Sequence, residues 1–320
     1  MHTCPVIVLN QLDPHPNADT LDIVQIGLYS CAVKKGEFRV GDLVVFLEPD
    51  TLVDTHMAQF QFLGDKRRIR PQRLRGLVSQ GLLVPAPEGA PVGLDVWALW
   101  GLQRYEPPQP VDTVGEAMTP PQGYFPVYDL LNGWTHGDLI PDGTPVMITE
   151  KLHGSSARYH LDTHGVLGVS SRREWKRPGS TVYSRVLDGF LPDLVRFLVD
   201  FPGATAYGEV YGWVQELRYG HQKGQVSFAA FDLWQRDHWA DPIWFRDMAE
   251  SYHLPLVPLL ARSWSYDSHA IAALIDGNTL AGGEERREGI VVRPVQNLIH
   301  EVDGRIALKF VSALHLQQDP

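Results

Sequence analysis

The stretch Met147-Ile148-Thr149-Glu150-Lys151-Leu152-His153-Gly154-Ser155-Ser156 carries a lysine from a short apolar run into a glycine turn. Lys151 follows residues with strand character, where an ammonium group is normally avoided. A lysine in such a place can be partly desolvated, which makes its amine a usable nucleophile. The stretch therefore predicts a strand that ends on a reactive lysine.

A second Lys-x-x-Gly occurs at Lys176-Arg177-Pro178-Gly179. It lies in a charged, proline-containing stretch with no strand pattern before it, so we predict a loop there. Because the short motif occurs twice, it does not identify a nucleophile by itself. The assignment of Lys151 rests on the residues that follow it in the chain.

Length, charge and cysteine content limit the classes of protein to which this chain can belong. A chain of 320 residues favours two domains, since one domain usually takes about 100–200 residues. The formal net charge is −10, so nucleic-acid binding would need a local basic patch. Two cysteines are too few for a disulfide framework, and no apolar stretch is long enough to span a bilayer. We expect a soluble, cytoplasmic protein with no membrane partner.

The N-terminal third has the pattern of a small β-barrel. Short strands separated by turn residues are expected at residues 5–11, 21–26, 41–47 and 74–84. The segment resembles the OB-type tRNA-binding domains of some aminoacyl-tRNA synthetases in the loop at 15–19 and the runs at 40–45 and 75–83. We expect an OB-like domain at residues 1–104. A linker follows at residues 105–127, where Pro, Gln, Thr and Gly are frequent.

A basic run interrupts this barrel pattern at residues 66–75, with six Lys or Arg among ten positions. Lys and Arg side chains neutralise phosphates and release counterions, so such a run suits nucleic-acid binding. The residues assigned to this role are Arg67, Arg68, Arg70 and Arg73. The alternative is that the run is a solvated loop of the barrel.

The second domain is expected at residues 128–320, as an α+β fold built on antiparallel sheets. A hairpin is expected at residues 157–173, and helices are expected at 182–200, 243–252 and 267–276. Further strands are expected at residues 204–211, 226–233, 289–292 and 305–311.

Charged residues recur at strand-like positions downstream of Lys151: Arg172, Glu209, Glu288 and Lys309. Charges inside apolar strands are costly unless they are paired or used. With Lys151 this set suits adenylyl transfer, in which the lysine attacks an α-phosphate. A second lysine and a metal would neutralise the developing charge, and carboxylates would hold the metal or the ribose.

The order of these residues resembles the motifs of the covalent nucleotidyltransferases, which include polynucleotide ligases and mRNA capping enzymes. The matching segments are Lys151-Leu152-His153-Gly154, Ser171-Arg172, Tyr207-Gly208-Glu209, Phe231-Asp232, Glu288-Gly289-Ile290-Val291 and Leu308-Lys309. The resemblance spans residues 128–312 and implies the ligase adenylation fold.

Two features narrow the resemblance. Glu150 and His153 resemble the nick-sealing RNA ligase 2 group, although Ser156 stands where that group has Asn. An OB-like domain before the lysine domain, with few residues after Lys309, resembles the ATP-dependent RNA ligases typified by the Deinococcus enzyme. That resemblance implies joining of 3′-OH and 5′-phosphate ends at nicks in duplexes with an RNA 3′-OH strand. The alternatives are a DNA ligase, a capping-type guanylyltransferase, or a non-catalytic tRNA- or RNA-binding protein.

The resemblance also implies catalytic and metal roles. Lys151 would carry AMP covalently, and Lys309 would bind the α-phosphate of ATP. Glu209 and Glu288 would hold Mg²⁺ or Mn²⁺, and all four residues would take part in catalysis.

Nucleotide contacts are implied in the same way. Glu150 would contact the adenine amino group, and Phe231 would stack on the ring. Arg172 would hold the ribose side together with Glu209, and Gly154 would belong to the nucleotide site with Lys309.

Overall fold

The computed structural model describes residues 3–106, 117–177, 179, 181–301 and 304–318. They fall into two compact units. Residues 3–106 and 313–318 belong to the first unit, and residues 117–312 belong to the second. Each unit is described by itself.

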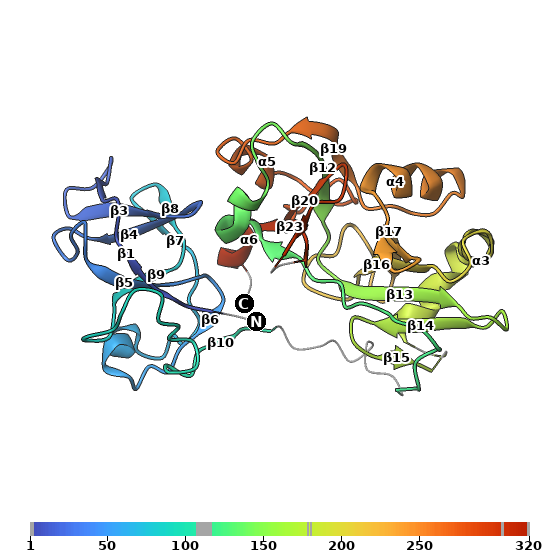
Figure 1. The fold of residues 1–320 in the computed structure, drawn as a ribbon, viewed down its shortest axis with the longest axis horizontal. Coiled ribbons are helices and arrows are strands. Elements are labelled where there is room, and N and C mark those ends of the chain that lie inside the picture. Colours follow the sequence, from blue (N-terminus) through green and yellow to red (C-terminus); the bar gives the residue numbers. More distant parts are fainter. Residues whose placement is uncertain (1–2, 107–116, 178, 180, 302–303, 319–320) are drawn as a thin grey trace. The chain divides into compact units, whose positions relative to one another are not determined.

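The first unit is the expected OB-like barrel, made of short antiparallel strands (Figure 1). One sheet has the order β1 (Val6–Val8), β5 (Leu43–Leu47) and β9 (Leu82–Pro85). Another has the order β2 (Asp13–Pro14), β3 (Leu21–Ile26) and β4 (Tyr29–Lys34). The remaining pairs are β6 (Thr51–Leu52) with β10 (Gln103–Arg104), and β7 (Gln72–Leu74) with β8 (Leu77–Ser79).

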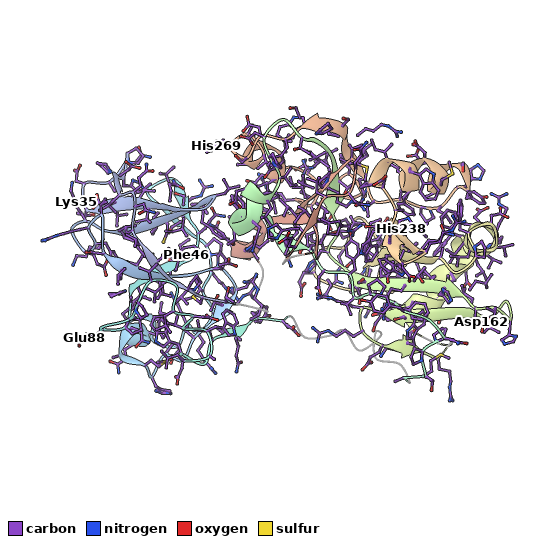
Figure 2. All side chains as sticks on the ribbon, in the orientation of Figure 1. Lys35, Phe46, Glu88, Asp162, His238 and His269 are labelled. Carbon is purple, nitrogen blue, oxygen red and sulfur yellow. The ribbon has the colours of Figure 1, made fainter. Side chains whose placement is uncertain are left out.

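Side chains of both three-stranded sheets meet in the interior of this unit. Phe46 on β5 packs against Tyr29 on β4, with 5.1 Å between the ring centroids (Figure 2). Strand β4 is absent from the sequence predictions, although its residues alternate between buried and less buried positions as a half-buried strand should. The 3₁₀ helix η1 (Ala58–Leu63) adds the buried Phe60 to the core.

The second unit contains two larger sheets, as the α+β prediction requires (Figure 1). The five-stranded sheet has the order β11 (Leu131–Asn132), β23 (Leu308–Val311), β20 (Gly289–Pro294), β12 (Pro145–Lys151) and β19 (Leu259–Ser265). The six-stranded sheet has the order β15 (Trp175–Lys176), β14 (Leu167–Ser171), β13 (Ser155–Leu161), β16 (Thr205–Gly212), β17 (Val226–Gln235) and β18 (His238–Trp239). Strands pair antiparallel throughout these two sheets, except that β11 runs parallel to β23.

The hairpin expected at residues 157–173 is β13 and β14, with Asp162 in the turn between them (Figure 2). Its carboxylate accepts hydrogen bonds from the backbone N–H groups of His164 and Val166, which fixes the turn. A short pair of strands, β21 (Ile299–His300) and β22 (Gly304–Arg305), precedes β23.

The helix expected at residues 182–200 is broken. It consists of α2 (Val182–Arg185), the 3₁₀ helix η4 (Val186–Gly189) and α3 (Leu191–Asp200). Pro192 lies in the first turn of α3, where proline favours the start of a new helix. The apolar side chains still form one core, because Leu187, Phe190 and Leu194 all belong to the cluster that packs on the six-stranded sheet.

The other helices are short. They are α1 (Gly133–His136), the 3₁₀ helix η3 (Gly137–Leu139), α4 (Pro242–Ser251), α5 (Ala272–Ile275) and, in the first unit, α6 (Ala313–Gln318). Among the described residues, none of the helices has the length and apolar character needed to cross a bilayer.

The predicted linker, residues 105–127, includes residues 107–116, which lie outside the described residues. From residue 117 onward it packs on the second unit. The N–H of Met118 donates to the carbonyl of Trp175 at 2.9 Å, and the Phe125 ring lies 4.8 Å from the Trp175 ring. This part of the segment therefore contributes side chains to a folded unit.

The loop predicted around Lys176 is wrong. Lys176 belongs to β15 and is buried, with its Nζ 2.7 Å from Glu174 Oε2. The sequence pattern could not reveal this, because β15 depends on pairing with β14 and with Ala117, and on packing of Trp175 against Phe125.

Candidate active site

A cavity of about 170 Å³ in the second unit is lined by residues from both large sheets. The predicted site residues in its wall are Glu150, Lys151, Arg172, Glu209, Phe231 and Lys309. Strand β12 supplies the first two of these, and β16 and β17 supply Glu209 and Phe231. The structure thus brings together residues that lie up to 159 positions apart in the chain.

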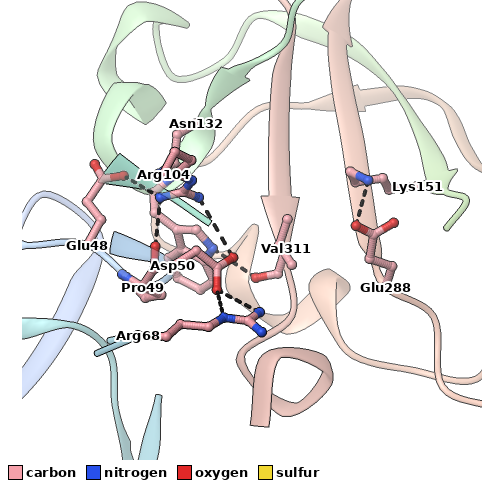
Figure 3. Close-up of polar contacts among 10 residues, drawn as sticks. Glu48, Pro49, Asp50, Arg68, Arg104, Asn132, Lys151, Glu288 and Val311 are labelled. Atoms are coloured by element: carbon pink, nitrogen blue, oxygen red, sulfur yellow. Dashed lines mark hydrogen bonds and ion pairs between the residues drawn. The ribbon is translucent and has the colours of Figure 1, made fainter. Parts of the chain in front are cut away.

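Lys151 is the last residue of β12, and its Nζ lies 2.6 Å from Oε1 of Glu288 (Figure 3). Glu288 immediately precedes β20, which pairs with β12 so that Lys151 lies opposite Gly289. The register of two neighbouring strands therefore sets this ion pair. Both side chains are largely buried, which strengthens the interaction relative to one in water.

Gly154 allows the turn after Lys151 to approach the six-stranded sheet. A Cβ atom at this position would lie 2.1 Å from the backbone oxygen of Val210 on β16, so no other residue fits without a shift. The close approach places the turn directly against the strand that carries Glu209. Gly154 thus brings the nucleophile and a carboxyl group to one site.

Glu209 is half-buried beside the charges of Lys151 and Glu288. Burial raises the pKa of Glu209 to about 8, and Glu288 adds to the increase, although Lys151 and His153 oppose it. Desolvation of the ionised carboxylate is therefore the main cause of the shift. A divalent metal at this carboxyl group would favour its ionised form.

His153 lies between two carboxylates. Its Nε2 is 2.8 Å from Glu216 Oε2, and its Nδ1 is 3.6 Å from Glu288 Oε2. Burial disfavours the charged ring, but the two carboxylates outweigh this and raise the pKa of His153 to about 9. The ring is therefore cationic at neutral pH and shares Glu288 with Lys151.

Glu150 is a buried polar residue of the cavity wall, with 1% of its surface exposed. Its Oε1 accepts a hydrogen bond from Thr279 Oγ1 at 2.5 Å, and its Oε2 accepts one from the N–H of Leu280 at 2.7 Å. Burial raises the pKa of Glu150 despite these donors. Each oxygen keeps a second lone pair with which it can accept a further hydrogen bond.

Phe231 forms an aromatic wall with Tyr128, and their ring centroids are 4.6 Å apart. Arg172, at the end of β14, forms an ion pair with Asp129 at the exposed rim. Lys309 lies on β23 opposite Val291 of β20. The predicted residues in the cavity wall therefore supply an aromatic face, two carboxylates and three cations.

The sequence predictions missed a buried charge cluster that reaches the cavity wall at Arg293. Asp232 has no exposed surface, and its Oδ2 lies 3.0 Å from Arg293 and 2.8 Å from Arg305. Arg293 also donates to the backbone oxygen of Phe231 at 2.6 Å. Arg293 is a charge in an apolar strand, so the criterion that selected Glu209 could have found it.

The basic run divides into two groups in the first unit. Arg68 lies 2.9 Å from Asp50 and 3.6 Å above the Tyr105 ring, so this residue stabilises the barrel itself (Figure 3). Arg67 and Arg73 are exposed, and Arg70 is half-buried. Arg68 is thus held inside its own unit by an ion pair, and Arg67 donates to the carbonyl of Val53 at 3.4 Å.

Solved structures similar to this chain are forms of Naegleria gruberi RNA ligase. A variant with ATP and Mn has a TM-score of 0.82 at 23% identity, over 99% of each chain. A variant with AMP and Mn has a TM-score of 0.80 at 23% identity, over 99% of this chain and 98% of that one. The enzyme with PPi has a TM-score of 0.79 at 24% identity, with the same shares covered. These similarities show a shared fold.

Family models identify both units. A model of an OB-fold domain matches residues 5–86. A model described as RNA ligase matches residues 144–311, which is more than half of the chain and contains the whole set from Lys151 to Lys309. A comparison with curated proteins finds no match. With a lysine-centred cavity built from the segments that this family model covers, the chain belongs to the RNA ligase family.

Proposed function

We propose that this protein is an ATP-dependent RNA ligase of the Deinococcus type, which joins 3′-OH and 5′-phosphate ends at nicks through a lysyl-AMP intermediate. The observation that carries the proposal is the position of Lys151, at the end of β12 and in the wall of one cavity with Glu150, Phe231 and Lys309. A nucleophile, a base-binding carboxylate, an aromatic face and a second cation are the groups that adenylyl transfer needs.

In the first step, Nζ of Lys151 attacks the α-phosphorus of ATP. A P–N bond forms, the bond to the β-phosphate oxygen breaks, and pyrophosphate leaves. The amine must first lose a proton, and Glu288 Oε1 lies within hydrogen-bond distance to take it. Lys309 would neutralise the charge that develops on the α-phosphate.

In the second step, an oxygen of the RNA 5′-phosphate attacks the phosphorus of lysyl-AMP, and Lys151 leaves with a proton. The 5′ end then carries AMP in a pyrophosphate linkage. In the third step, the RNA 3′-OH attacks the 5′-phosphorus, the new phosphodiester forms, and AMP is released. Each step exchanges one bond at phosphorus, so positioning and charge neutralisation supply most of the catalysis.

The base end of the cavity supports adenine. The Glu150 carboxylate can accept a hydrogen bond from the adenine amino group, whereas it would face the carbonyl oxygen of guanine without a hydrogen between them. Phe231 and Tyr128 offer an aromatic wall for stacking. This arrangement supports ATP over GTP as the donor.

The donor set also fits a divalent metal. Glu209 and Glu288 offer carboxylate oxygens beside Lys151, and a bound cation would offset the burial that raises the pKa of Glu209. Oxygen ligands of this kind suit Mg²⁺ or Mn²⁺. When bound, the metal would neutralise phosphate charge, and the Naegleria enzyme has been solved with Mn.

The RNA substrate would contact both domains of the chain. Residues 128–320 would carry the chemistry, and the OB-like domain at residues 1–104 would contact phosphates of a nicked duplex. The contacts would come from the exposed Arg67 and Arg73 and the half-buried Arg70.

The test is self-labelling with ATP or GTP radiolabelled at the α-phosphate, in the presence of Mg²⁺ or Mn²⁺. We expect label from ATP on the wild-type protein and none on Lys151→Ala. Lys176→Ala is the matched control, because it removes the other Lys-x-x-Gly lysine, and it should label normally. The labelled protein should then seal a nick with an RNA 3′-OH strand faster than an all-DNA nick. Label on Lys151→Ala would contradict the proposal.

A further inference from the structure

The loop between β16 and β17 contacts the turn that follows Lys151. The N–H of His153 donates to the hydroxyl oxygen of Tyr219 at 2.6 Å. Glu216 binds the His153 ring at 2.8 Å, and the amide of Gln215 donates to the carbonyl of Gly154 at 3.4 Å. One loop therefore contacts both residues that complete the turn.

Apolar packing adds to these polar contacts. Leu152 is buried in a small cluster with Tyr219, Ala229 and Val257, separate from the main core of the second unit. Residues 152–154 directly follow the nucleophile. Each of them contacts this loop, through hydrogen bonds or through packing against Tyr219. These contacts restrain the backbone that directly follows Lys151.

Tyr219 is itself held in an unusual conformation. Its backbone φ is +54°, in the left-handed region that a bulky residue rarely adopts. Glu285 Oε1 accepts hydrogen bonds from the N–H groups of Arg218 and Tyr219, each at 3.2 Å. Tyr219 is 2% exposed, and its ring lies 5.2 Å from the Tyr211 ring. A strained residue kept in place by its surroundings is typical of a functional site.

The same segment that fixes Tyr219 also fixes the base end of the cavity. The N–H of Thr279 donates to the carbonyl of Glu285 at 2.9 Å, and the Thr279 hydroxyl donates to Glu150. Residues 279–285 therefore connect the carboxylate proposed to bind adenine with the tyrosine that binds the nucleophile turn. This segment therefore links Glu150 to the backbone turn that follows Lys151.

We infer that Tyr219 is a positioning residue for transfer of AMP to and from Lys151, acting through the backbone of His153. This inference rests on the proposed function. Attack on the α-phosphorus requires the amine to be in line with the leaving group, and a displacement of about 1 Å can cost on the order of 100-fold in rate. Tyr219 is absent from the cavity wall, so its effect reaches the reaction through the turn.

The experiment compares two reactions of Tyr219→Phe. One is self-adenylylation from labelled ATP, in which Lys151 is the nucleophile. The other is sealing of a nicked duplex whose 5′ end already carries AMP, in which Lys151 does not attack. We expect the self-adenylylation rate to fall at least about 10-fold and sealing to stay within about twofold of the wild type. Retained sealing also shows that the variant is folded.

Tyr266→Phe is the matched control. The Tyr266 hydroxyl is also buried in the second unit and makes a 2.9 Å hydrogen bond to the backbone, at the carbonyl of Gly137. Both rates of this variant should match the wild type. Equal loss of both reactions in Tyr219→Phe, or no loss of self-adenylylation, would overturn the inference alone. Absence of label on the wild-type protein would overturn the proposed function and this inference together.

Discussion

Lys151 and Glu288 form an ion pair of 2.6 Å in which the same carboxylate lies 3.6 Å from the His153 ring. The amine that would attack ATP therefore forms an ion pair as an ammonium group in this structure. A nucleotide must draw Lys151 away from this partner, or Glu288 must accept its proton, before the reaction can begin. This makes Glu288 the carboxylate whose removal should have the largest effect on the first step.

Replacement of Glu288 by Gln should lower the rate of self-adenylylation by about 100-fold or more, the usual contribution of a positioned proton acceptor. The fold should persist, because Gln keeps the size and hydrogen-bonding capacity of the side chain. The measurement is the initial rate of label transfer from ATP, with thermal unfolding as the check on folding. A rate close to that of the wild type would remove Glu288 from the reaction.

Nucleotide binding should depend on pH through Glu150. Burial raises the pKa of Glu150, so it takes up a proton at a higher pH than an ordinary glutamate does. The protonated form has fewer lone pairs for the adenine amino group, so KM for ATP should rise as the pH falls. Glu150→Gln cannot titrate and should lose this part of the dependence. Identical pH profiles for the two proteins would contradict the assignment.

The raised pKa of Glu150 also affects the free energy of unfolding. The unfolded chain loses the Glu150 proton at a lower pH than the folded chain does. The contribution of this group is therefore fully present below the ordinary glutamate pKa and is lost as the pH rises through the folded value. In the absence of nucleotide, the free energy of unfolding should fall with rising pH more steeply in the wild type than in Glu150→Gln. Urea titrations at several pH values measure this difference.

The cluster of Asp232 with Arg293 and Arg305 should be the most sensitive charge group in the second unit. Asp232→Asn leaves two buried guanidinium groups without their shared carboxylate, which should cost about 3–5 kcal/mol in the free energy of unfolding. Asp247→Asn is the contrast, because its ion pair with Arg262 is exposed and should matter little. Similar losses in both variants would show that burial does not govern these pairs.

The basic run should act on substrate binding and not on the lysine. Changing Arg67, Arg70 and Arg73 together to Gln should leave self-adenylylation unchanged and weaken sealing of a nicked duplex. The salt dependence of RNA binding should fall by about one unit of slope for each lost phosphate contact. Arg68→Gln should instead lower thermal stability, because it breaks the Asp50 pair. An unchanged salt dependence in the triple variant would identify the run as a solvated loop.

The sequence predicted those parts of the site that consist of charges at strand positions. Lys151, Glu209 and Lys309 are costly in apolar strands, so their presence indicates use, and the structure places all three in one cavity wall. Arg293 follows the same logic, because it is a charge in an apolar strand and pairs with the buried Asp232.

Other features depend on contacts between distant segments. Tyr219 belongs to a loop with no regular pattern, and its importance comes from a hydrogen bond to His153, 66 residues earlier. Thr279 reaches Glu150 across 129 residues. The short strand that holds Lys176 likewise depends on its pairing with β14 and with Ala117. No local periodicity reports such contacts.

The parallel pairing of β11 with β23 has a practical consequence for dissecting the protein. Leu131 and Asn132 cover the outer edge of the strand that carries Lys309. Without them, β23 would present unpaired backbone groups to solvent, and open strand edges recruit other chains into aggregates. A ligase fragment should therefore begin upstream of Tyr128, which keeps both the edge cover and an aromatic wall of the cavity. Fragments that begin after Asn132 should precipitate rather than report on catalysis.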